Sequence, residues 1–191
     1  MIDGKKVTAI VVTKGDVDLD PIRDSLAVFD QVLIWDNSKQ ILDPCRDRKV
    51  YGRYLCAQWA DNDTVYVQDD DCLINVGLLC DLYEPGELLC NVKSHHAKVY
   101  KERYPGISLV GWGAIYPKSM IDFSPYLAKY PEDELFDREC DRVFTWLNRA
   151  KTRMVNVGIE DLKHATGKDR MGTEARHGAD LVAVIEKLKT L

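Results

Sequence analysis

The chain has 191 residues, of which 46% are hydrophobic and 30% charged, and this size and composition suit one compact domain with a sizeable core. The formal net charge of −5 argues against general binding to nucleic acid or to an anionic membrane surface. A basic run at residues 93–103 is interpreted either as a solvated loop or helix face, which is favoured, or as a local groove that holds a nucleic-acid strand.

The start of the chain carries no secretion signal, and no apolar segment reaches the length of a membrane span. We therefore expect a cytoplasmic protein, in the host cytoplasm if a phage encodes it. The six cysteines include no C-x-x-C pair, which indicates small core residues in a reducing compartment rather than a zinc site.

The first half of the sequence alternates between buried strands and helices. A β-branched run at 7–12 predicts a strand, Asp20-Pro21 predicts an N-cap and the start of a helix to about residue 29, and 31–35 predicts a second strand. Strand, helix and strand in this order favour a parallel βαβ unit. The elements expected next are a short strand near 50–51, a helix at 54–59, a strand at 64–68, a helix at 75–83 and a strand at 87–92.

The second half begins with the basic run and a glycine-broken segment at 111–116. A helix at 137–150, a strand at 154–157 and a last helix at 178–188 are expected after it. No internal repeat or linker interrupts the chain. The sequence thus predicts a single α/β domain with a mostly parallel sheet flanked by helices.

Polar side chains follow three of the predicted strands. Thr13 ends the first strand, Asp36 follows the second, and Asp69, Asp70 and Asp71 follow the strand at 64–68. In an open parallel sheet, ligands bind beyond the carboxyl ends of the strands, so we expect these groups to share one edge.

The three adjacent aspartates are the strongest single feature of the sequence. Their charges repel one another unless a cation or a hydrogen-bond donor compensates, and Mn²⁺ or Mg²⁺ prefers such oxygen ligands and bridges to phosphate. Alternation along an extended chain would direct Asp69 and Asp71 to one side and Asp70 to the other. The alternative interpretation is an acidic turn after an edge strand.

Residues 67–74, Val-Gln-Asp-Asp-Asp-Cys-Leu-Ile, resemble the D-x-D segment of GT-A fold glycosyltransferases, particularly the exostosin-like branch. Residues 32–37, Arg53, the segment 111–116 and the run Glu139-Cys140-Asp141 resemble other parts of the same family in order and spacing. The resemblance covers roughly residues 7–150 and implies a GT-A, Rossmann-like fold, a divalent metal cofactor and a UDP-sugar donor. It also implies that about residues 1–92 form a nucleotide-binding half and about residues 93–191 an acceptor-side half.

The resemblance also implies a role for each matching residue. Asp71 would ligate the metal together with Asp69, while Asp69 and Asp70 would also contact ribose or sugar. The remaining donor-side residues would be Thr13 and Asp36 at the base and ribose, Arg53 at the base or diphosphate, and Gly113 where the sugar approaches closely. His164 would be the late histidine that completes the set of metal ligands.

Asp141 lies beside the apolar stripe of the predicted helix at 137–150, where partial burial would raise its pKa and suit a general base that deprotonates an acceptor hydroxyl. A surface carboxylate paired with a nearby arginine is the equal alternative. Glu132 and Asp133 are the rival acids. Trp112 either stacks on a sugar or packs in the core, and core packing is favoured.

These features predict a metal-dependent glycosyltransferase that moves a sugar from a nucleotide diphosphate to a hydroxyl of a glycan, a protein or a hydroxylated base in phage DNA. Three other functions fit some of the same features. A haloacid-type phosphatase normally carries its Asp-x-Asp on the first strand, a sugar-1-phosphate nucleotidyltransferase needs a glycine-rich loop that only Gly15 would supply, and a non-catalytic nucleotide-binding module would leave Asp141 idle.

Overall fold

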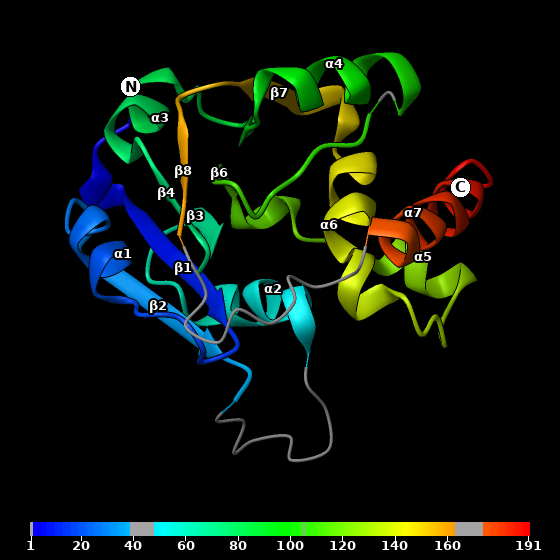
Figure 1. Ribbon diagram of the computed structural model, residues 1–191, viewed down its shortest axis with the longest axis horizontal. Coiled ribbons are helices and arrows are strands. Elements are labelled where there is room, and N and C mark those ends of the chain that lie inside the picture. The colour runs from blue at the N-terminus through cyan, green and yellow to red at the C-terminus, as the bar shows by residue number, and fades with distance from the viewer. Residues whose placement is uncertain (1, 39–47, 105, 163–173) are drawn as a thin grey trace.

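The computed structural model describes residues 2–38, 48–104, 106–162 and 174–191 (Figure 1). The strands are β1 (Val7–Thr13), β2 (Gln31–Asp36), β3 (Thr64–Asp69), β4 (Cys72–Ile74), β5 (Leu88–Asn91), β6 (Ala114–Pro117), β7 (Thr152–Val155) and β8 (Ile159–Asp161). The α-helices are α1 (Asp20–Ser25), α2 (Gly52–Cys56), α3 (Val76–Leu82), α4 (Ser94–Arg103), α5 (Ser124–Lys129), α6 (Phe136–Leu147) and α7 (Glu174–Leu188).

A six-stranded sheet in the order β2-β1-β3-β6-β5-β7 forms the centre of the molecule. β1 pairs in parallel with β2 and with β3, and β5 pairs in parallel with β7, whereas β6 runs antiparallel to both of its neighbours. The described strands β1, β2, β3, β5 and β7 therefore all point the same way. This confirms the predicted α/β class with a mostly parallel sheet.

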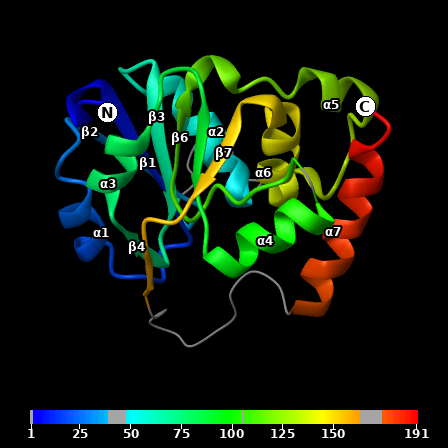
Figure 2. The same ribbon diagram turned by 90° about the horizontal axis from the view of Figure 1, so that it is seen from above.

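Helices cover both faces of this sheet, with α1 and α3 on one side and α2 and α6 on the other (Figure 2). The central strands are buried on both faces, so their side chains alternate between two cores. In β3, Val65 and Val67 join the core with α2, α6 and α7, while Tyr66 joins the core with α1 and α3. This explains why β1 and β3 are continuous apolar runs in the sequence.

The core between the sheet and α6 is rich in aromatic rings. Phe144 of α6 packs against Tyr54 of α2 and Tyr116 of β6, with ring centroids 5.1 and 4.7 Å apart. The expectation that cysteines are core residues is confirmed for the five that the structure describes, which are buried and free: Cys56, Cys72, Cys80, Cys90 and Cys140. Burial raises the pKa of the Cys80 thiol to about 11, so this group stays protonated near neutral pH.

Several local expectations were wrong. The strand expected near Val50 is a 3₁₀ helix, Lys49–Tyr51, in which the Tyr51 amide donates to the Arg48 carbonyl at 2.9 Å. Its aromatic ring packs on Phe136 of α6, and this tertiary contact outweighs the strand preference of the short apolar pair. α1 is shorter than expected and its N-cap is Leu19 rather than Asp20.

Other elements were missed in the sequence. These are α5, which has a proline in its first turn, and β4 and β8, which pair in a separate two-stranded ladder. The basic run forms the helix α4, one of the two forms considered for it. β4 and β8 are three residues long each, too short for a clear period-two pattern. The ladder matters for the site because β4 directly follows the aspartate segment.

Candidate functional site

The carboxyl ends of three neighbouring strands bring the predicted polar residues to one edge. In the parallel register Thr13 of β1 lies opposite Asp36 of β2, and Val12 lies opposite Asp69 of β3. This arrangement follows from the parallel sheet, as expected from the sequence. We call Asp69, Asp70 and Asp71 the aspartate segment.

Asp69 is fixed from two directions. Its Oδ1 forms a short ion pair with Nη2 of Arg53, which comes from α2. On its other side lies Gly111, whose carbonyl accepts the Asp69 amide at 2.7 Å and whose missing side chain leaves the room that the carboxylate occupies. A Cβ built on Gly111 would lie 2.0 Å from Asp69 Oδ2. The Asp69 side chain keeps 35% of its surface exposed, so it still faces solvent.

Arg53 also binds Asp141, the acidic residue predicted on α6. Nη1 of Arg53 lies 3.2 Å from Asp141 Oδ2, and the hydroxyl of Tyr54 donates to Asp141 Oδ1 at 2.7 Å. Burial raises the pKa of Asp141, Arg53 opposes that rise, and the charge of Asp69 adds to it. The carboxylates of Asp141 and Asp69 outweigh burial at Arg53 and raise its pKa, so the guanidinium stays charged.

The structure brings Arg53 and Asp141 together. Arg53 was expected at the base or diphosphate, and here its side chain has no exposed surface. Asp141 was expected either as a partly buried general base or as a surface carboxylate beside a nearby arginine. Its partner is Arg53 of α2, which places Asp141 one side chain away from Asp69.

The other residues expected on the donor side, Thr13, Asp36 and Asp70, differ in their exposure and in their hydrogen bonds. Thr13 is 1% exposed, and its hydroxyl accepts the Gly15 amide at 2.8 Å, so its side chain stabilises the turn after β1. Asp36 is partly exposed and accepts the amide of Ser38 at 2.9 Å through Oδ1. Asp70 is 8% exposed and its Oδ2 lies 3.4 Å from the Lys14 amide.

Gly113, expected where the sugar approaches closely, has close protein neighbours on the side where a Cβ would lie. It has a φ of +94°, which favours glycine, and a Cβ there would lie 2.7 Å from Ile74 and 3.4 Å from the Tyr66 hydroxyl. Protein atoms therefore fill the space beside it, and Gly111 is the glycine that approaches the aspartate segment. The sequence alone does not distinguish Gly111 from Gly113. The structure does, because the end of β3 meets the loop before β6 at Gly111, whose carbonyl accepts the Asp69 amide.

A divalent cation could bind at this edge only if oxygen atoms from outside the described residues complete its coordination. Among the residues that the structure describes, no group of three or more His, Cys, Asp or Glu side chains converges on one point. Asp69 and Asp71 are partly exposed hard oxygen donors, and a small hard cation commonly takes its remaining ligands from phosphate and water. His164 lies outside the described residues. The carboxylate donor set therefore suits Mg²⁺ or Mn²⁺ only where the remaining ligands come from outside the described residues.

Asn91 is a structural residue of this edge that the sequence analysis missed. It is fully buried at the end of β5, and its Nδ2 donates to the carbonyls of Trp112 and Gly158 at 3.0 and 3.2 Å. Its Oδ1 accepts the amide of Val157 at 2.9 Å. One side chain thus joins three segments that meet beside the aspartate segment. The signal available in the sequence was an asparagine that directly follows an apolar run.

The basic run lies at the same edge, because α4 follows the carboxyl end of β5. Lys93 pairs with Asp161 of β8 at 2.9 Å and lies 5.1 Å from the ring centroid of Trp112, against which His96 also packs. Lys98 and Lys101 are exposed on α4. Trp112 is partly buried and packs against the core with α1 and α3, as favoured from the sequence, and it also contacts Lys93 and His96 at this edge.

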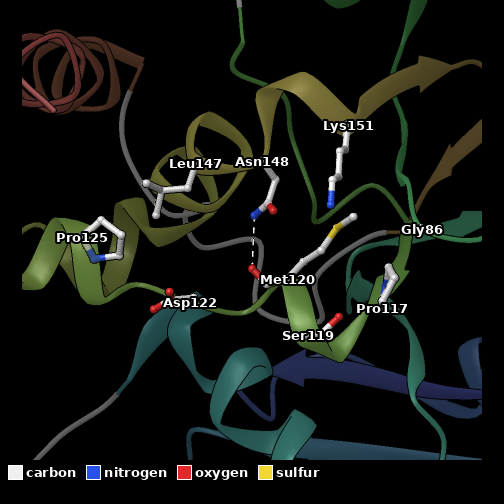
Figure 3. A pocket seen from close by; sticks show the side chains of 9 residues that line it. All are labelled: Gly86, Pro117, Ser119, Met120, Asp122, Pro125, Leu147, Asn148 and Lys151. Carbon is white, nitrogen blue, oxygen red and sulfur yellow. Dashed lines mark hydrogen bonds between the residues drawn. The ribbon is translucent and has the colours of Figure 1, made fainter.

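The opposite edge of the sheet carries a separate pocket of about 310 Å³ (Figure 3). Its lining includes Pro117 at the end of the antiparallel β6, and Met120 and Asn148, which are joined by a hydrogen bond of 3.2 Å. None of its lining residues belongs to the aspartate segment or its partners.

Within the described parts of the chain, no helix is long and apolar enough to cross a bilayer.

Comparison with solved structures agrees with this architecture. Glucosyl-3-phosphoglycerate synthase from Mycobacterium tuberculosis, solved with Mn²⁺, UDP and glucosyl-3-phosphoglycerate, aligns over 98% of this chain and 80% of its own, with a TM-score of 0.55 and 13% identity. The chain has the GT-A fold. The same enzyme with Mn²⁺, UDP-glucose and glycerol 3-phosphate aligns over the same shares with a TM-score of 0.57 and 13% identity.

A second GT-A neighbour is a glycosyltransferase involved in the glycosylation of the major capsid of PBCV-1. It aligns over 78% of this chain and 82% of its own, with a TM-score of 0.50 and 8% identity. No protein-family model and no curated protein matches the sequence. At these identities the similarity concerns the fold, and the neighbours do not single out the exostosin-like branch.

Proposed function

We propose that this protein is a metal-dependent glycosyltransferase that moves a sugar from a UDP-sugar to an acceptor hydroxyl. The observation that carries this proposal is the meeting of Asp36 and the aspartate segment at one sheet edge, with Asp69 oriented by Arg53 and Gly111. Support comes from the GT-A fold, because structures of its neighbour glucosyl-3-phosphoglycerate synthase contain UDP with Mn²⁺ or with Mg²⁺.

The donor would bind across the ends of β1, β2 and β3. Asp36 is exposed enough to accept hydrogen bonds from the base or ribose, and Asp69 and Asp71 would hold the cation against the diphosphate. Bound there, a divalent ion would stabilise the negative charge of the departing diphosphate. Asp70 would support the segment through its contact with the Lys14 amide.

On the acceptor side, Asp141 would take the proton of the acceptor hydroxyl. Its Oδ1 and Oδ2 face Tyr54 and Arg53, but an ionised carboxylate has about four lone-pair sites, which leaves acceptor capacity on both oxygens. Burial raises its pKa, and a less acidic carboxylate is a stronger base. The rival Asp133 is engaged by Tyr126 and Lys187, away from the aspartate segment.

The direct test is turnover. The protein should release UDP from a UDP-sugar such as UDP-glucose in the presence of Mn²⁺, slowly with water and faster with the right acceptor among glycans, proteins and hydroxymethylated DNA. Binding of UDP without any release would favour the non-catalytic module. Metal-dependent release of phosphate from p-nitrophenyl phosphate, with no UDP release, would favour the phosphatase.

A further inference from the structure

Arg53 is a buried cation between two carboxylates from different elements. It comes from α2, its side chain has no exposed surface, and it pairs with Asp69 at the end of β3 and with Asp141 on α6. Its Nε also donates to the Val50 carbonyl at 3.2 Å. The guanidinium is thus held by hydrogen bonds to Asp69 and to the Val50 carbonyl and by an ion pair with Asp141, in which the buried Nη1 makes no hydrogen bond.

Each nitrogen of Arg53 faces a protein group, so the side chain has no surface for a nucleotide. Charged hydrogen bonds from a planar guanidinium fix direction as well as distance, and a lysine ammonium does not reproduce this geometry. What Arg53 does impose is the orientation of its partners. With Oδ1 of Asp69 bound to Arg53, Oδ2 lies on the side of Gly111.

The charges in this cluster do not cancel. One guanidinium is shared by two carboxylates, so Arg53, Asp69 and Asp141 together carry one net negative charge when all are ionised. If Asp141 lost its charge, Arg53 would be left to Asp69 alone and would neutralise it fully. A divalent cation would then gain less from Asp69, because charge interactions at a partly desolvated site are strong.

We propose that Arg53 is a positioning residue that orients Asp69 for cation binding and makes that binding depend on Asp141. This inference rests on the proposed function, because it assigns a cation to Asp69. It differs from a purely structural role. A structural ion pair would change the free energy of unfolding and leave the Mn²⁺ affinity of the folded molecules unchanged.

The test compares Mn²⁺-dependent UDP affinity, measured by calorimetry, in Arg53→Lys, Asp141→Asn and the double variant. Thermal unfolding of each variant reports whether it is folded. Changing a residue that orients a metal ligand typically costs about 10- to 100-fold in metal affinity, and we expect losses of this size for both single variants. In the double variant the loss should be smaller than the product of the two, because both changes break the same link.

A matched control is Arg153→Lys. Arg153 also binds a carboxylate, that of Glu87 at 2.6 Å, but at the opposite edge of the sheet, so its substitution should leave Mn²⁺ and UDP affinity unchanged. If Asp141→Asn does not fold, Tyr54→Phe removes only the hydrogen bond to Asp141 Oδ1 and should give a smaller loss in the same direction.

Each result has one meaning. If the parent protein binds UDP with Mn²⁺ and folded Asp141→Asn or Tyr54→Phe binds it equally well, the positioning role is wrong and the proposed function stands. If the parent protein binds UDP no better with Mn²⁺ than in EDTA, the proposed function fails and the positioning role fails with it.

Discussion

The backbone of Gly111 lies directly against the carboxylate of Asp69, since a Cβ at Gly111 would lie 2.0 Å from Oδ2 and 2.5 Å from Cγ. Gly111→Ala should therefore displace the Asp69 carboxylate and lower Mn²⁺-dependent UDP affinity by about 10- to 100-fold, as measured by calorimetry. The φ of Gly111 is not among the positive values, so alanine adds a clash and no backbone strain.

Gly77→Ala in α3 is the control for this substitution. The nearest atom to its new Cβ would be Asn75 Oδ1 at 3.8 Å, and the change should raise the free energy of unfolding by about 0.5–1 kcal/mol without affecting UDP binding. Unchanged affinity in Gly111→Ala would mean that the Asp69 carboxylate does not contact the cation.

Asp36→Ala tests whether the second strand borders the nucleotide. If Asp36 accepts hydrogen bonds from the base or ribose, UDP affinity should fall by about 1–3 kcal/mol, the usual cost of an unsatisfied polar partner. Asp122→Ala serves as control, because Asp122 also caps a local turn but lies beside the pocket at the opposite edge. Equal UDP affinity in the two variants would remove Asp36 from the site.

Asp141→Asn should slow sugar transfer at saturating donor by about 10²–10⁴-fold, the range of general-base assistance. Because burial raises the pKa of Asp141, the parent rate should fall with decreasing pH at a higher pH than an ordinary aspartate would give. The pH–rate profile in the acid range checks this. Parent-level transfer by folded Asp141→Asn would exclude it as the base.

Asp133 should affect stability and not chemistry. Burial acts to raise its pKa, but the bonds from Lys187 and Tyr126 outweigh burial and lower it. A lowered folded-state pKa stabilises the protein above the unfolded-state pKa, and this contribution is lost as pH falls through the folded-state value. Asp133→Asn should thus cost about 1–3 kcal/mol at neutral pH, less in acid, with transfer unchanged. Lost transfer in folded protein would revive Asp133 as the base.

The sequence was sufficient to predict the main strands and the class of fold, but not most of the tertiary contacts. Continuous β-branched runs such as 7–12 identify strands buried on both faces, and strand order along the chain was enough to predict that Asp36 and Asp69 share an edge. The pairing of β4 with β8 and the helix α5 depend on tertiary contacts that short segments do not encode.

The site shows the same limit at the level of side chains. Arg53 was expected near the nucleotide because it resembles an arginine of the GT-A family, and only the packing of α2 against α6 shows that Asp141 is its partner. Similarly, Gly111 and Gly113 are equivalent in the sequence, and the register of the loop against β3 decides which one meets Asp69.

The most direct test is calorimetric titration of the parent protein and of Asp71→Ala with UDP, once in Mn²⁺ and once in EDTA. The parent protein should bind UDP in Mn²⁺ and lose most of that affinity in EDTA, because cation and diphosphate complete one another's ligand shell. Asp71→Ala should stay folded, as judged by thermal unfolding, and bind UDP equally weakly in both buffers. Equal UDP affinity of the parent protein in Mn²⁺ and in EDTA would contradict the claim that the aspartate segment binds a nucleotide diphosphate through a divalent cation.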